Sequence, residues 1–250
     1  MKRKHLKNHS QDLNLMSESV FEEIKKLWDN SNYSSKHPVY WDIYKHLFVD
    51  YDRDQDIRIL EIGVATGEGM ELFKKIFPNC HICGIEIDES LPHSSVGNIW
   101  VGSQTNIELL DAISEEEGPF DIVIDDASHM NEHQIITFEH LFPKINPGGV
   151  YIVEDTHTSY WDKYGGGYSS DSFMNYTKKM NDMINYESWQ KGYESPRFLY
   201  QRVVDRGDIQ RYESYNIDPI IYKNINCIST YPNITVFYKS KFEGEYQFNI

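Results

Sequence analysis

The chain has 250 residues and carries 39 acidic side chains against 24 lysines and arginines, which gives a formal net charge of −15. Its length suits one large domain, and its 40% hydrophobic content excludes general disorder. The acidity argues against a nucleic-acid partner and against docking on an anionic membrane.

Region 1–50 predicts a tail followed by a helical cover. Residues 1–16 are polar and basic, which is typical of a frayed tail. Apolar side chains at helical spacing then predict a helix up to about residue 28 and a second helix over 40–48. We place the main domain at 51–250.

Beyond this cover, short apolar runs alternate with helical patterns. The runs are 57–63, 81–87, 99–101, 120–124 and 150–153, and the helical patterns between them are 67–77, 106–114 and 132–142. Apolar strands that alternate with helices predict a parallel sheet covered on both faces. Two last runs, 225–231 and 234–239, predict an antiparallel hairpin. We expect an α/β fold: a doubly wound, Rossmann-like sheet, mostly parallel, with a C-terminal antiparallel hairpin.

Segment 156–215 is the least regular part of the main domain. It holds three consecutive glycines at 165–167, two tryptophans and many tyrosines. Aromatic, glycine-rich loops above the ligand edge of a sheet act as lids or acceptor walls, and we expect such an insertion here. An aromatic-filled helical layer is the alternative.

Three cysteines, Cys80, Cys83 and Cys227, are too few for a disulfide framework. Cys80 and Cys83 have the spacing of a redox or zinc pair, but a zinc ribbon needs a second pair and these two residues lie in an apolar run. We interpret them as buried thiols. No apolar leader or membrane-spanning stretch is evident, so a reduced, cytoplasmic protein is expected.

A glycine-rich turn follows the first predicted strand and opens a helix. Its spacing, G-x-x-x-G-x-G at Gly63, Gly67 and Gly69, differs from that of dinucleotide-binding and Walker loops. Glu61 and Glu68 would repel a pyrophosphate, so a nucleoside ligand without phosphates fits better. S-adenosylmethionine, with its cationic sulfonium, is such a ligand.

Glu86 ends the second predicted strand, 19 residues after Gly67. A carboxylate at this place accepts the two ribose hydroxyls in nucleotide-binding α/β folds. The alternative for the whole segment is a tight turn that binds no ligand.

Carboxylates also end the fourth and fifth predicted strands, as Asp125 and Asp126 and as Glu154 and Asp155. Asp126 and Asp155 are 29 residues apart, the length of one βαβ unit, so their strands should be neighbours. Uncompensated carboxylates so close together would repel one another. Oxygen ligands select a hard cation, Mg²⁺ or else Ca²⁺ or Mn²⁺, and not zinc. Helix capping or pairing with lysine or arginine is the alternative.

His129 follows Asp126 by three residues and is a candidate general base. With Glu132 and His133 it also matches the zinc-peptidase pattern H-x-x-E-H. That pattern needs both histidines on one helical face, whereas His129 is expected to precede the helix. We therefore favour a base, and expect His133 and His140 to face solvent or pack on the sheet.

Three segments resemble the class I S-adenosylmethionine-dependent methyltransferases: Ile59-Leu-Glu-Ile-Gly-Val-Ala-Thr-Gly67, Asp121-Ile-Val-Ile-Asp-Asp-Ala-Ser-His129 and Pro147-Gly-Gly-Val-Tyr-Ile-Val-Glu-Asp155. More narrowly, they are similar to the metal-dependent sugar O-methyltransferases of macrolide tailoring, the mycinamicin and macrocin types. Rhamnosyl O-methyltransferases and the so-called cephalosporin hydroxylases share these motifs. The similarity runs from about Ser35 to Trp161, and Ala127 stands where the family commonly has glycine.

The resemblance implies roles for individual residues. Mg²⁺ would be bound by Asp126, Glu154 and Asp155, and His129 would abstract the proton. The cofactor would be lined by Glu61, Gly63, Gly67 and Glu86, with Ser103, Gln104 and Asp125 nearby.

The expected function is transfer of the methyl group of S-adenosylmethionine to a hydroxyl of a sugar or glycosylated small molecule. A catechol-like or other small-molecule acceptor, an NAD-dependent oxidoreductase and a binding module without turnover are the alternatives. The expected partner is the acceptor itself, and a homo-oligomer is left open.

Overall fold

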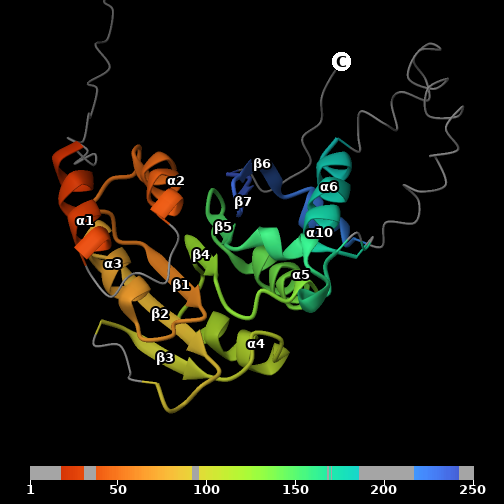
Figure 1. Ribbon diagram of the computed structural model, residues 1–250, viewed down its shortest axis with the longest axis horizontal. Helices are drawn as coiled ribbons and strands as arrows, with labels where there is room; N and C mark the ends of the chain where they lie inside the picture. The colour runs from red at the N-terminus through yellow and green to blue at the C-terminus, as the bar shows by residue number, and fades with distance from the viewer. Residues whose placement is uncertain are drawn as a thin grey trace, which may run out of the picture.

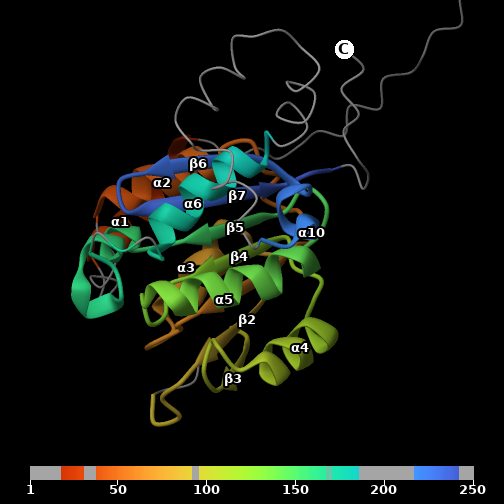
Figure 2. The same ribbon diagram turned by 90° about the vertical axis from the view of Figure 1, so that its right-hand side faces the viewer.

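A seven-stranded sheet organises the chain (Figure 1). The computed structural model describes residues 18–30, 38–91, 96–167, 169, 171–185 and 217–241. The strands are β1 (Arg58–Ile62), β2 (His81–Glu86), β3 (Asn98–Val101), β4 (Ile122–Asp125), β5 (Val150–Val153), β6 (Ile225–Tyr231) and β7 (Ile234–Lys239). Their order is β3-β2-β1-β4-β5-β7-β6, which Figure 2 shows with β6 at the top and β3 at the bottom.

The pairing confirms the predicted fold class. β1 to β5 are parallel, whereas β7 is antiparallel to both β5 and β6. The turn between β6 and β7 contains Asn233 at φ 64°, a left-handed conformation that asparagine tolerates well. β7 lies between β5 and β6, and its first four residues are buried, whereas β6 forms the edge and only its first residue, Ile225, is buried.

Helices cover both faces of the sheet. α1 (Glu18–Asn30), α2 (Pro38–Phe48) and α3 (Glu68–Ile76) lie on one face; α4 (Ile107–Glu116), α5 (Asn131–Leu141), α6 (Phe173–Met183) and the short α10 (Pro219–Tyr222) lie on the other. Three short 3₁₀ helices complete the described elements: η1 (Phe142–Lys144) lies between α5 and β5, and η2 (Thr156–Tyr160) and η3 (Asp162–Tyr164) lie between β5 and α6. Both cover helices expected in region 1–50 are present; the domain boundary at residue 50 stays a prediction.

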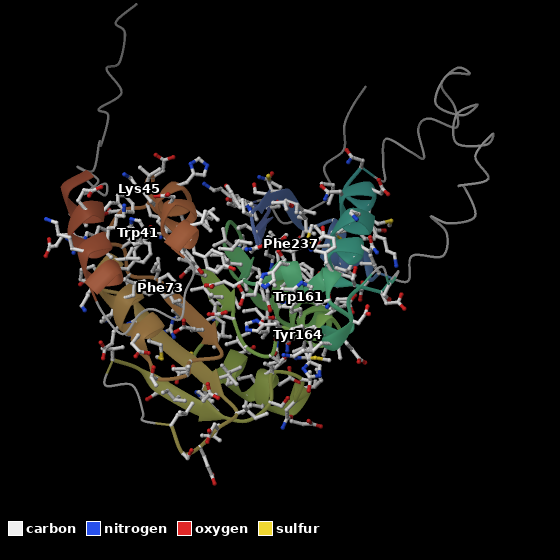
Figure 3. All side chains as sticks on the ribbon, viewed as in Figure 1. Trp41, Lys45, Phe73, Trp161, Tyr164 and Phe237 are labelled. Atoms are coloured by element: carbon white, nitrogen blue, oxygen red, sulfur yellow. The ribbon has the colours of Figure 1, made fainter. Side chains whose placement is uncertain are left out.

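Alternation along the strands divides the core into two layers. In β1, Ile59 packs into the layer under α1, α2 and α3, and Leu60 packs into the opposite layer. Trp41 and Phe73 belong to the first layer and Phe237 belongs to the second (Figure 3). Side chains of α2 pack in the first layer against side chains of the strands, and this packing fixes the position of α2 relative to the sheet edge.

Cys80 and Cys83 are buried free thiols at the start of β2, as interpreted from the sequence. Burial raises the pKa of both thiols, which keeps them protonated and unreactive. No helix in the described ranges is long and apolar enough to cross a bilayer. Of the insertion predicted at 156–215, the structure describes residues up to 185 apart from 168 and 170; the remainder lies outside the described residues.

Candidate functional site

The site residues predicted from the sequence all lie at or just beyond the carboxyl ends of β1 to β5. They are Glu61, Gly63 and Gly67 in and after β1, Glu86 at the end of β2, Ser103 and Gln104 after β3, Asp125, Asp126 and His129 at and after β4, and Glu154 and Asp155 after β5. The strand order reverses between β1 and β4, and open α/β sheets bind ligands at such a switch point.

Gly63 brings two turns of this edge into contact. Its φ is 88°, and a Cβ at this position would lie 2.4 Å from the carbonyl oxygen of Asp126 and 2.5 Å from Cα of Ala127. Any other residue would push apart the turns after β1 and β4. The glycine is therefore required by the approach of the Asp126 turn.

Glu61 lies against the first turn of α3. Its side chain is 2% exposed, and a Cβ at Gly69 would lie 2.0 Å from its Oε1 atom. The positive end of the helix dipole favours a carboxylate at that place. Gly67, at φ 89°, precedes the helix. The glutamate and the glycines thus fix the turn and the start of the helix.

Glu86 is held by backbone donors at the end of β2. Its Oε2 accepts the Ala65 N–H at 2.8 Å, and Oε1 accepts those of Ile87 and Asp88 at 2.8 and 3.0 Å. A carboxylate has about four acceptor positions, so Glu86 keeps capacity for a further donor such as a ribose hydroxyl. Its partner Ala65 belongs to the glycine turn, which places the carboxylate beside that turn.

Gln104 and Asp125 form a buried polar link between the turns after β3 and β4. The Gln104 amide donates to both oxygens of Asp125, at 3.1 and 3.3 Å, and its Oε1 accepts the Ser128 N–H at 3.0 Å. Asp125 is 1% exposed, and burial raises its pKa to about 7. Ser103, which is partly exposed, contacts Thr105 at 3.0 Å between their hydroxyls. Of these three residues, only the serine is open to solvent.

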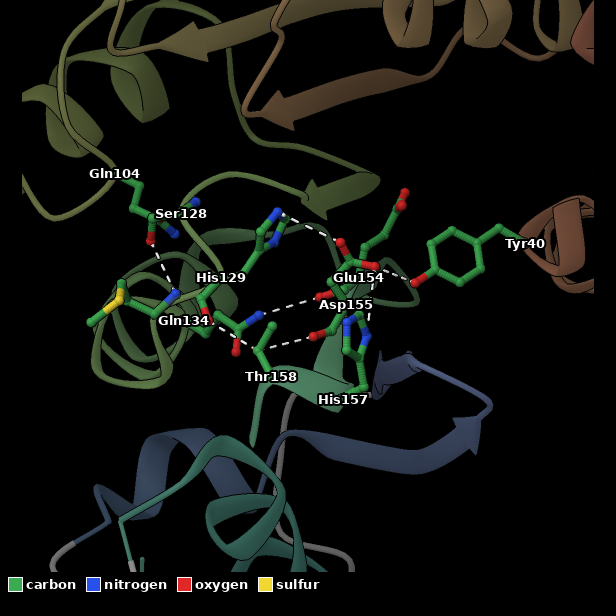
Figure 4. A network of polar contacts seen from close by, with 10 residues as sticks. Tyr40, Gln104, Ser128, His129, Gln134, Glu154, Asp155, His157 and Thr158 are labelled. Carbon is green, nitrogen blue, oxygen red and sulfur yellow. Dashed lines mark hydrogen bonds and ion pairs between the residues drawn. The ribbon is translucent and has the colours of Figure 1, made fainter. Parts of the chain in front are cut away.

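Asp126, His129 and Asp155 form a cluster at the centre of the edge (Figure 4). One ligand atom from each lies within 4.8 Å of the others, and all three side chains are partly exposed. His129 Nε2 is 3.6 Å from Asp155 Oδ2. Within the described ranges, this is the one group of three or more acidic, histidine or cysteine side chains that could hold a metal ion.

Backbone strain accompanies the cluster. His129 and Asp155 both have φ 56°, the left-handed region that non-glycine residues rarely adopt. Each such conformation costs on the order of 1–3 kcal/mol, and it persists where the surroundings over-determine it. Asp155 lies two residues after β5 and His129 four residues after β4, and the side chains of both belong to the cluster.

Glu154, the third ligand implied by the resemblance, lies deeper than this cluster. It is fully buried and accepts the Tyr44 hydroxyl through Oε1. His129, and not Glu154, supplies the third atom of the partly exposed cluster. Direct metal ligation by Glu154 stays a prediction.

Two tyrosines on α2 complete the site and were missed by sequence reasoning. Tyr40 donates its hydroxyl to Asp155 Oδ1 and Tyr44 donates to Glu154, one helical turn apart on the same face. In Figure 4 Tyr40 approaches Asp155 from the side opposite His129. Burial, reinforced by these carboxylates, raises the pKa of both phenols, so they act as donors.

Replacing these hydroxyls should have unequal effects on stability. Tyr44→Phe removes a donor from a fully buried carboxylate, and we expect the free energy of unfolding to fall by about 1–3 kcal/mol. Tyr40→Phe should cost less, because water can reach Asp155, whose side chain is 29% exposed. Urea unfolding of both variants measures the difference, and an equal or reversed order would contradict it.

The H-x-x-E-H pattern does not form a zinc site. His133 lies on α5, where its Nδ1 contacts the Ser128 hydroxyl at 2.9 Å, while His129 precedes the helix. Neither Glu132 nor His133 belongs to the exposed cluster. His140 packs beside Asp111, with 2.9 Å between Nε2 and Oδ1. The expectation that His129 precedes the helix is confirmed.

Curated relatives of the chain are O-methyltransferases. L-olivosyl-oleandolide 3-O-methyltransferase of Streptomyces antibioticus is 34% identical over 165 residues, which are 61% of this chain and 43% of the relative. Mycinamicin VI 2''-O-methyltransferase of Micromonospora griseorubida is 41% identical over 134 residues, 49% of this chain and 33% of the relative. The chain thus spans less than half the length of either. No family model matches it.

Solved structures extend the similarity to the fold. The methyltransferase MycE of the mycinamycin pathway, in complex with Mg and SAH, superposes with a TM-score of 0.70 at 30% identity, over 88% of this chain and 54% of that one. This chain has the class I S-adenosylmethionine-dependent methyltransferase fold. A second MycE structure, in complex with Mg, SAH and mycinamycin VI, has a TM-score of 0.66 over the same shares of both chains.

The residues of this methyltransferase fold suit the groups that the resemblance implies. Asp126 and Asp155 offer carboxylate oxygens, the donors that Mg²⁺ prefers, and their partial exposure leaves room for the waters that this ion retains. His129 would be a single nitrogen beside them. Glu86, beside the glycine turn, offers the acceptor that a ribose requires. The donor chemistry therefore fits both a divalent cation and a nucleoside cofactor.

Proposed function

We propose that this protein is a metal-dependent O-methyltransferase that moves the methyl group of S-adenosylmethionine to a hydroxyl of a sugar or glycosylated small molecule. The observation that carries the proposal is the cluster of Asp126, His129 and Asp155 at the same sheet edge as the glycine turn and Glu86. The curated relatives, sugar O-methyltransferases by name, support the acceptor class.

The carboxylate residues provide the binding and orientation. Asp126 and Asp155 would hold the cation, with Glu154 as a further ligand or as negative charge behind them. A bound divalent cation lowers the pKa of a hydroxyl that coordinates it. Tyr40 fixes the rotamer of Asp155 by donating to Oδ1, which leaves Oδ2 directed at His129.

His129 is the proposed base. Its Nε2 points into the cluster, and Nδ1 of the same ring is buried without a hydrogen-bond partner in the described part of the chain. A neutral ring protonated at Nδ1 presents the Nε2 lone pair to an acceptor hydroxyl and takes its proton.

The cofactor side of the site lies at β1 and β2. Glu86 would accept the ribose hydroxyls, and Gly63 and Gly67 would shape the turn beside them, with Ser103 at the rim. S-adenosylmethionine carries its methyl group on a sulfonium cation. The negative charge of the strand ends favours this cation, while Glu61, Gln104 and Asp125 support the turns from behind.

Labelled methyl transfer tests the proposal. The full chain, Mg²⁺ and methyl-labelled S-adenosylmethionine are incubated with three panels: methyl glycosides with free vicinal hydroxyls, catechols, and no acceptor. Label should appear in glycosides. Label in catechols alone would show that the acceptor is a catechol and not a sugar. If calorimetry showed binding of NAD but not of S-adenosylhomocysteine, the result would support an oxidoreductase.

Two further expectations belong to this proposal. Residues 51–250 would be the catalytic domain, with an acceptor-binding insertion at about 156–215. A cytoplasmic location is supported by the free, buried thiols of Cys80 and Cys83, which suit a reducing compartment.

A further inference from the structure

A run of aromatic rings borders the cluster on the segment after β5. Ring centroids are 6.4 Å apart for His129 and Tyr164, 5.9 Å for Tyr164 and Trp161, and 4.7 Å for Trp161 and His157. His157 Nδ1 lies 3.9 Å from Asp155 Oδ1. These four rings, which we call the aromatic rim, therefore form a path that begins and ends at Asp155.

Trp161 is the open ring of this rim. It is 50% exposed, whereas Trp41 in the core is 2% exposed. The Lys163 ammonium lies 5.0 Å from the Tyr164 ring centroid, so a cation already covers Tyr164. Removing the apolar surface of an exposed indole from water is favourable, and a ligand that packs on the ring would bury this surface. Figure 3 shows Trp161 next to Tyr164.

The segment that carries the rim is held rigidly. The Asn131 amide, itself 1% exposed, donates to the Tyr164 carbonyl at 2.9 Å and to the Thr158 carbonyl at 3.3 Å. Its Oδ1 accepts the Ser159 hydroxyl at 2.8 Å. A Cβ at Gly166 would lie 2.4 Å from the Thr158 carbonyl oxygen, so the chain is tightly folded there. Because the segment is already ordered, a ligand that binds to it does not incur the entropic cost of ordering a loop.

We propose that the Trp161 indole binds the C–H face of the acceptor's sugar ring and directs the ring's hydroxyls towards Asp155 and His129. A pyranose has apolar C–H faces and a polar edge of hydroxyls. The C–H faces pack on an aromatic ring through dispersion and weak C–H contacts. The hydroxyls donate hydrogen bonds to carboxylate and imidazole groups. This inference rests on the proposed function, because the reacting hydroxyl is placed at the cluster.

Three variants separate the rim from its surroundings. Trp161→Ala removes the ring, Trp161→Phe keeps a smaller one, and Tyr160→Ala is the matched control. Tyr160 is 58% exposed and adjacent, but it makes no ring contact with a described residue. Circular dichroism of each variant verifies folding.

Binding is measured without turnover, by saturation-transfer NMR with methyl glycosides of pyranoses that have free vicinal hydroxyls. The wild type and Tyr160→Ala should transfer saturation to the sugar C–H protons, Trp161→Phe less, and Trp161→Ala almost none. In turnover, Trp161→Ala should raise the KM for the glycoside about tenfold, equivalent to about 1.4 kcal/mol. The KM for S-adenosylmethionine should stay unchanged.

The outcomes distinguish this inference from the proposed function. Unchanged glycoside binding in Trp161→Ala would overturn the inference. An equal loss of binding in Tyr160→Ala would also overturn it. So would a wild-type protein that binds no glycoside, whether or not it binds a catechol. If the wild type binds glycosides through Trp161 but transfers no methyl group, the proposed function fails while the binding role of Trp161 stands.

Discussion

His129→Ala should reduce methyl transfer by about 10²–10⁴-fold, the range expected when a general base is removed. The imidazole is the one basic nitrogen in the cluster, and its Nε2 lies 3.6 Å from Asp155 Oδ2. Affinity for S-adenosylhomocysteine should be retained, because Glu86 and the glycine turn lie at the ends of β1 and β2. Single-turnover transfer and calorimetry measure the two effects.

His133→Ala is the matched control for this change. His133 lies four residues further on and contacts Ser128 at 2.9 Å, outside the cluster. The rate of methyl transfer by His133→Ala should stay within about threefold of the wild-type rate. A His129→Ala rate equal to that of the control would show that another group takes the proton. Loss of cofactor binding in His129→Ala would assign this histidine to the cofactor instead.

Asp155→Asn should weaken divalent-metal binding by about 100-fold and reduce turnover at least as much, since it removes one of the two exposed carboxylates of the cluster. Asparagine keeps an oxygen that can accept the Tyr40 hydroxyl, so the fold should be preserved. Titration with Mn²⁺, followed by its electron paramagnetic resonance signal, reports the affinity without turnover.

Two further variants interpret the Asp155 result. Asp162→Asn changes an exposed carboxylate in the same segment and should leave Mn²⁺ affinity unchanged. Glu154→Gln tests the deeper carboxylate: if it is a ligand, Mn²⁺ affinity falls as far as in Asp155→Asn. A smaller fall would indicate that Glu154 acts through its charge and through Tyr44. Unchanged affinity in Asp155→Asn would contradict the metal site itself.

The sheet and the edge that carries the site were predictable because they follow from local pattern and chain topology. Apolar runs ended by glycine or carboxylates place Glu86, Asp126 and Asp155 at strand ends, and right-handed crossovers bring parallel strand ends together. The hairpin was equally visible in its two apolar runs. The sequence did not predict which strand of the hairpin pairs with β5, because either strand of a hairpin can pair with the edge of a sheet.

Long-range polar contacts could not be predicted. Tyr40 and Asp155 are 115 residues apart, and nothing in the spacing of α2 shows that its buried face carries hydroxyls to the ends of β5. The left-handed backbone of His129 and Asp155 was not predicted either, because histidine and aspartate adopt this region more often than most residues but residue type alone does not predict it. The close approach of Gly63 to the Asp126 turn was not predicted either, and its place beside the cofactor stays a prediction.

The central claim is that this sheet edge transfers a methyl group only when a divalent cation is bound. The most direct measurement is labelled methyl transfer to a glycoside in excess EDTA, followed by addition of Mg²⁺ in excess over the chelator. We expect transfer to stop in EDTA and to return with Mg²⁺, while S-adenosylhomocysteine binding stays unchanged in both conditions. Full transfer in EDTA would contradict the account.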